Sequence, residues 1–143
     1  MTEAEREHWQ AYIRQIADRM HLKDWRVELR QRPPENKDAA AEVLCTYGRK
    51  LAYIYFAQDW ADIEAEKQRH FVVHELVHLH LQTVRDMVEQ DMKGVLGNQA
   101  HEVLLWPFKR ALEYGVDGLA DAIAPLMPLP GDVVSELKQG QAA

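Results

Sequence analysis

Hydrophobic residues recur at helical spacing from residue 3 to residue 20. The large apolar side chains of this stretch share one side of a helix with about 3.6 residues per turn: Trp9, Tyr12, Ile13, Ile16 and Met20. Thr2 stands just before the stretch, and Glu5 follows it by three residues, which is the pattern of a capping box at a helix N-terminus. We therefore expect an N-terminal amphipathic helix whose apolar side packs in the core.

Alternation of apolar and polar positions follows. Residues 25–29 alternate large apolar and charged side chains, as in a half-buried strand. Two further strands are expected at residues 41–47 and 50–56, joined by a tight turn at Gly48-Arg49 and rich in tyrosine and β-branched residues. The pattern predicts a small, mostly antiparallel sheet that precedes the long central helix, and thus an α+β fold.

No glycine or proline interrupts residues 59–93, which favours one long helix. It contains His74-Glu75-Leu76-Val77-His78, an HExxH pattern within a strongly apolar stretch. On a helix, His74 and His78 lie one turn apart on the same side, so both imidazoles can bind one zinc ion. Glu75 is placed to act on the water that zinc holds, as the general base of a hydrolase. The alternative is a structural helix with partly exposed histidines paired to acids.

A catalytic zinc ion usually has three protein ligands, and we expect Glu113 to be the third. Asp117 follows one helical turn later and is expected to orient a ligating imidazole. Alternatives remain open in both roles. The other candidates for the third ligand are His70, His101 and Glu102, and Asp121 is an alternative orienting acid.

The HExxH pattern followed by Glu113 and Asp117 resembles the gluzincin group of zinc metallopeptidases, and the short chain is similar to the minigluzincins. The resemblance implies a zincin-like fold, zinc binding by His74, His78 and Glu113, and catalysis by Glu75. It also implies a tyrosine or histidine that stabilises the oxyanion, for which the candidates are Tyr53, Tyr55, His101 and Tyr114. The metzincin pattern does not fit, because the residues after His78 lack its glycine and third histidine.

The strand at residues 50–56 is of interest for substrate binding. At a sheet edge beside the metal, its open backbone groups would pair with an extended peptide. The alternative is an ordinary strand in which the charged Lys50 discourages pairing with another chain.

Helical spacing returns at residues 99–126, after glycines at positions 94 and 97, and Pro107 indicates a kink or a junction between two C-terminal helices. Residues 131–143 are small and polar, as in a flexible C-terminal tail. We therefore expect one metallopeptidase domain at residues 1–130, followed by that tail.

Composition narrows the function further. The 143 residues carry a net charge of −6, which disfavours nucleic acid and anionic membranes as partners. One cysteine and an acidic, polar start without signal-peptide character favour a cytoplasmic protein. We expect a zinc-dependent peptidase that acts on a peptide or protein substrate. The alternative is a zincin-fold regulatory protein that binds or cleaves one specific partner. The oligomeric state is left open.

Overall fold

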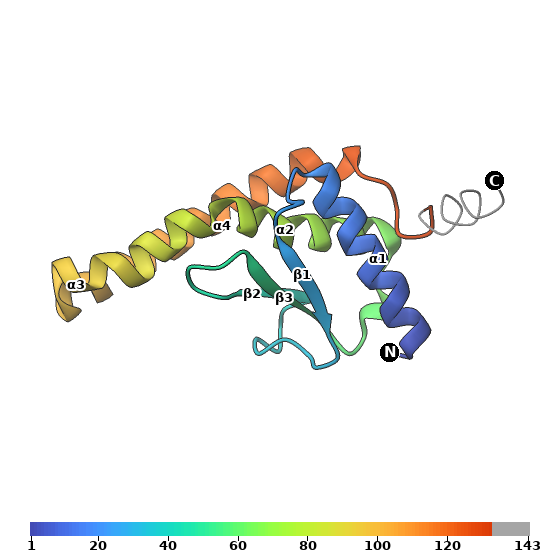
Figure 1. Ribbon diagram of the computed structural model, residues 1–143, viewed down its shortest axis with the longest axis horizontal. Helices are drawn as coiled ribbons and strands as arrows, with labels where there is room; N and C mark the ends of the chain where they lie inside the picture. The colour runs from blue at the N-terminus through green and yellow to red at the C-terminus, as the bar shows by residue number, and fades with distance from the viewer. Residues whose placement is uncertain (133–143) are drawn as a thin grey trace.

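The computed structural model describes residues 1–132 and has an α+β architecture in which helices pack on a small sheet (Figure 1). Its helices and strands, in chain order, are α1 (Glu3–Arg19), β1 (Arg26–Arg30), β2 (Ala41–Cys45), β3 (Leu51–Phe56), α2 (Ala65–Asp86), α3 (Met92–Leu96) and α4 (Asn98–Ile123). A π-helical segment, η2 (Met87–Asp91), joins α2 to α3, and short 3-10 turns, η1 (Trp60–Asp62) and η3 (Ala124–Leu126), precede α2 and follow α4.

Helix α1 begins as the sequence predicts. The hydroxyl of Thr2 accepts a hydrogen bond from the backbone N–H of Glu5, and the Glu5 carboxylate accepts one from the N–H of Thr2. This capping box satisfies donors that the first helical turn leaves unpaired. The apolar side of α1 is buried, and it contacts β1 and α2.

The sheet has the strand order β1-β3-β2 and is mixed. Strand β2 runs antiparallel to β3, whereas β1 runs parallel to it. The prediction of a mostly antiparallel sheet is therefore wrong for β1, because an alternating pattern is the same for either strand direction. Of the two interpretations left open for residues 50–56, the edge strand is excluded, because β3 lies between β1 and β2. Strand β3 is central, which agrees with the burial of most of its residues, and β2 is the edge strand beside α2.

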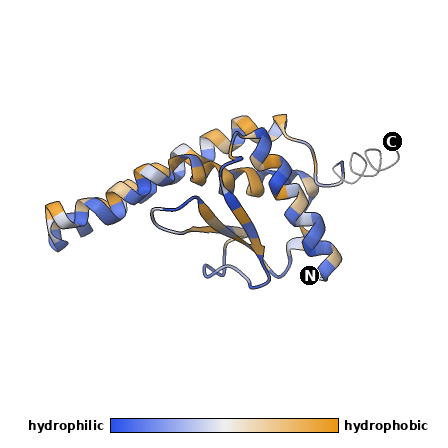
Figure 2. Ribbon diagram, viewed as in Figure 1, coloured by the Kyte–Doolittle hydropathy of each residue, from blue (hydrophilic) through white to orange (hydrophobic). Residues whose placement is uncertain are grey.

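The sheet packs with α1 and α2 into a single core. In Figure 2, much of α2 and of the strands has the colour of hydrophobic residues. At one end of the core, the rings of Phe56 and Trp60 stack with their centroids 3.8 Å apart, and Trp9 packs edge-on against both. The buried amide of Gln68 donates to the backbone oxygen of Trp60 at 2.8 Å. These contacts attach the start of α2 to the end of β3.

Helices α2 and α4 form an antiparallel hairpin that extends beyond the sheet (Figure 1). The reversal occurs at Gly97, whose backbone has φ 76° and ψ 165°. Helix α4 runs through Pro107 as one element, so the predicted junction between two helices is wrong. Pro107 is exposed, and solvent can satisfy the carbonyl that loses its hydrogen bond there.

Two further observations concern the described part of the chain. No helix within residues 1–132 combines the length and apolarity needed to cross a membrane. The expected tail at residues 131–143 lies outside the described residues from position 133 onward, and Gly131 and Asp132 belong to a turn.

Candidate metal centre

His74 and His78 lie one turn apart on α2 and project toward α4. Their Nε2 atoms are 3.3 Å apart. The side chain of His78 is buried, and that of His74 is mostly buried. Two imidazole nitrogens this close, on one helix, can both bind the same ion.

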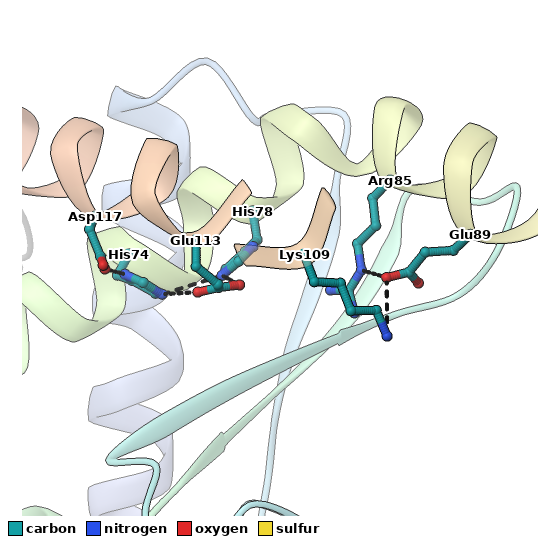
Figure 3. Close-up of polar contacts among 7 residues, drawn as sticks. All are labelled: His74, His78, Arg85, Glu89, Lys109, Glu113 and Asp117. Atoms are coloured by element: carbon teal, nitrogen blue, oxygen red, sulfur yellow. Dashed lines mark hydrogen bonds and ion pairs between the residues drawn. The ribbon is translucent and has the colours of Figure 1, made fainter. Parts of the chain in front are cut away.

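Glu113 on α4 completes the group of donors (Figure 3). Its Oε2 is 3.6 Å from Nε2 of His74, and its Oε1 is 3.5 Å from Nε2 of His78. Two donors of a tetrahedral zinc site lie about 3.3 to 3.6 Å apart, given the usual zinc–nitrogen and zinc–oxygen distances. The three side chains are thus close enough to hold a metal ion.

Asp117 lies one turn beyond Glu113 on α4, and its Oδ1 is 3.2 Å from Nδ1 of His74. A carboxylate in this position favours the tautomer of His74 that leaves Nε2 free for a metal. Asp121 contacts His70 instead, at 3.6 Å. The buried Nδ1 of His78 has no hydrogen-bond partner among the described residues.

Glu75 is 8% exposed and lies between the histidines of α2 and strand β2. Burial raises its pKa to about 8, while His74 and the backbone of Val43 act in the opposite direction. A carboxyl group with such a pKa is mostly protonated at neutral pH, and a cation held by His74 and His78 would favour its carboxylate form. The carboxylate is the form that can act as a general base.

The three donors influence one another's protonation. Although burial acts to lower it, the Glu113 carboxylate and other acids nearby raise the pKa of His74. The hydrogen bond to His74 lowers the pKa of Glu113. Burial lowers the pKa of the more deeply enclosed His78. These shifts favour a proton on His74 over one on His78.

The alternative ligands lie elsewhere. His101 is buried in the hairpin, where its Nε2 is 2.8 Å from the backbone oxygen of Val88. Glu102 lines a separate hollow formed by η2, α3 and α4, and His70 is paired with Asp121. None of the three belongs to the donor group found within residues 1–132.

None of the candidates for oxyanion stabilisation lines the cavity beside the donors. Tyr114 is 71% exposed, and His101 contacts Val88. Tyr53 and Tyr55 lie under the guanidinium groups of Arg30 and Arg32. Side chains two positions apart on a strand share a face, so both tyrosines lie opposite the face that carries the buried Ile54.

A cavity of about 320 Å³ lies between the donors and β2, and it is lined by Asn36, Ala39, Ala41, Glu42, Val43, Leu44, His74, Glu75, His78, Arg85 and Glu113. Arg85 contributes the positive charge in this lining and was missed in the sequence. The signal was its position seven residues after His78, because residues two turns apart share a helix side.

Strand β2 turns an open edge toward this cavity. Hydrogen bonds join Thr46 to Leu51 and Ala40 to Ala57 across β2 and β3. In an antiparallel pair such residues alternate with residues whose backbone groups point outward. Ala41, Val43 and Cys45 therefore present their N–H and C=O groups on the side away from β3, where the N–H of Val43 already donates to the Glu75 carboxylate.

Comparison of the chain with protein-family models, curated proteins and solved structures finds no match. Inference about function therefore rests on the residues and the geometry of this cleft.

Proposed function

We propose that this chain is a zinc-dependent peptidase with a zincin-like fold of the gluzincin type. The observation that carries the proposal is the convergence of His74, His78 and Glu113 at the mouth of a cleft that also contains the buried Glu75. Two imidazoles and one carboxylate form a donor set typical of catalytic zinc, which leaves a further coordination position open. When bound, the ion would supply Lewis-acid activation of water and of a peptide carbonyl.

The protein's own residues account for the remaining chemistry. Glu75 takes a proton from the attacking water and delivers it to the leaving nitrogen as the peptide bond breaks. Glu75 lines the cavity beside the metal donors, where both transfers would take place. Asp117 holds the imidazole of His74 in one tautomer and orientation.

The open edge of β2 supports a peptide as the substrate. An extended peptide can add to the sheet there through backbone hydrogen bonds, beside the metal donors. The cavity is lined on that side by residues 41–44. A substrate in this position would bring a backbone carbonyl next to Glu75 and the metal donors.

The test compares the zinc-loaded protein with its Glu75→Gln variant on a mixed peptide library, read by mass spectrometry. Cleavage by the wild type alone, with equal zinc content in both proteins, is the expected result. Equal cleavage by the variant would remove Glu75 from its role as general base. Zinc retention without cleavage by either protein would contradict a peptidase and favour a protein that only binds its partner.

A further inference from the structure

Two cationic side chains lie near each other, Arg85 two helical turns beyond His78 and Lys109 one turn before Glu113 (Figure 3). Arg85 follows His78 by seven residues on α2, and Lys109 precedes Glu113 by four residues on α4. Both contact Oε1 of Glu89, at 3.0 Å from Nε of Arg85 and 3.7 Å from Nζ of Lys109. One carboxylate thus lies between two positive charges, and the group carries a net charge of +1.

The guanidinium of Arg85 retains binding capacity. Only its Nε donates to Glu89, and Nη1 and Nη2 make no hydrogen bond to another described residue. Arg85 is 32% exposed and lines the same cavity as His74, Glu75 and His78. A guanidinium with two free donors, and a second cation beside it, can bind a carboxylate strongly.

The direction of β2 relates this pair to a bound peptide. The backbone of Val43 is hydrogen-bonded to Glu75. Five residues later in the chain, the N–H of Gly48 is 3.4 Å from Oδ2 of Asp86. Strand β2 and helix α2 therefore run in the same direction, from the metal donors toward Arg85. A peptide antiparallel to β2 would place its N-terminal part at Arg85, whereas a parallel peptide would place its C-terminus there.

From these contacts we propose that Arg85 and Lys109 form a carboxylate-binding site that selects acidic peptides as substrates. This proposal rests on the proposed peptidase function. Seven helical residues span about 10 Å, which equals about three residues of an extended peptide. The carboxylate belongs either to an Asp or Glu side chain about three residues before the scissile bond or to the C-terminus of the peptide. Antiparallel pairing, which is slightly more stable per residue, favours the acidic side chain.

The experiment uses the zinc-loaded full chain and a peptide library prepared in two forms, with a free or an amidated C-terminus. Enrichment of Asp or Glu before the cut in both forms identifies a side-chain carboxylate. Enrichment of cuts near free C-termini, lost on amidation, identifies the terminal carboxylate. Equal cleavage of acidic and neutral peptides in both forms would overturn the proposal while leaving the peptidase intact.

Variants assign the preference to the two residues. Arg85→Gln and Lys109→Gln should each reduce the ratio of kcat/KM for acidic over neutral peptides, by roughly 10- to 100-fold for Arg85. Arg110→Gln removes the same charge from a residue that stacks on Trp106, and it should keep the ratio. Zinc content and thermal unfolding show that each variant is folded. An unchanged ratio in a folded Arg85→Gln protein would refute the site.

Binding separates this proposal from the proposed function. In the zinc-loaded Glu75→Gln protein, fluorescent peptides should bind without being cut, and acidic peptides should bind more tightly than their amide analogues. If the wild type binds acidic peptides in an Arg85-dependent way but cuts none, the peptidase function fails and the carboxylate site stands. Equal binding of acidic and amide peptides removes the site.

Discussion

Asp117 and Asp121 look equivalent in the sequence, since both lie on the row of α4 that starts at Glu113, yet they contact different histidines. Asp117 is next to Nδ1 of His74, and Asp121 is next to Nδ1 of His70. Replacing an acid that orients a metal ligand typically weakens metal binding about 10- to 100-fold. We expect this loss for Asp117→Asn and a larger one for Glu113→Gln, measured by competition with a zinc chelator. Asp121→Asn is the matched control and should retain wild-type affinity. A loss as large in Asp121→Asn would mean that His70 belongs to the site.

Acid should release zinc from the donors. Burial opposes protonation of His74, but Glu113 and the other acids raise its pKa above the ordinary value. The metal needs the neutral imidazole, so zinc affinity should fall as pH drops through this raised pKa. Above that pKa, zinc affinity should reach its full value. Asp117→Asn removes one of the acids, so the fall should begin at a lower pH. Zinc affinity that is independent of pH between 5 and 8, taken as roughly the range in which histidine titrates, would contradict the assignment of His74.

The proximity of the two histidines is predictable from the sequence because their relation is local. Four residues on a helix always give one turn, whatever surrounds them. Glu113 and Asp117 are also one turn apart, but their approach to α2 depends on the hairpin formed by α2 and α4. Arg85 could not be selected from spacing alone. Its proposed role depends on its position beside β2, Glu89 and Lys109, which only the fold brings together.

At the scale of elements, the hairpin depends on the conformation of Gly97. Its φ of 76° and ψ of 165° fall in a region that is essentially restricted to glycine. Gly97→Ala should therefore destabilise the protein by roughly 1 to 3 kcal/mol, measured by denaturant unfolding. Gly94→Ala provides the opposite control. Gly94 lies within α3 without a positive φ and with open space around it, so alanine should stabilise by about 0.5 to 1 kcal/mol. Equal effects at both glycines would contradict the described reversal.

Strand direction shows where an element-level prediction reaches its limit. Alternation in β1 identifies its buried side chains, Val27 and Leu29, because side-chain period depends only on the extended backbone. The partner and direction of a strand depend on how connections cross the sheet. The segment between β1 and β2 allows β1 to lie parallel to β3, and β2 becomes the edge that faces the metal donors.

At the scale of the whole molecule, zinc should act as a stabilising ligand. A free zinc concentration about 100 times Kd adds about 2.7 kcal/mol to the free energy of unfolding if only the folded state binds. For 143 residues this corresponds to a rise in Tm of roughly 8 °C. Magnesium at the same concentration should change Tm little, because it prefers oxygen ligands. Glu113→Gln should lose most of the rise with zinc, and an equal rise in that variant would point to binding elsewhere.

The complete donor set lies on the single hairpin of α2 and α4, and this position bears on how the site folds. His78 and Glu113 are 35 residues apart in the chain, and Val43 and Glu75 are 32 residues apart, so contact order favours neither pair as the first to form. The apolar side of α4 belongs to the same core as the sheet and α1. We therefore expect the metal donors and the substrate cleft to form together in one cooperative folding step.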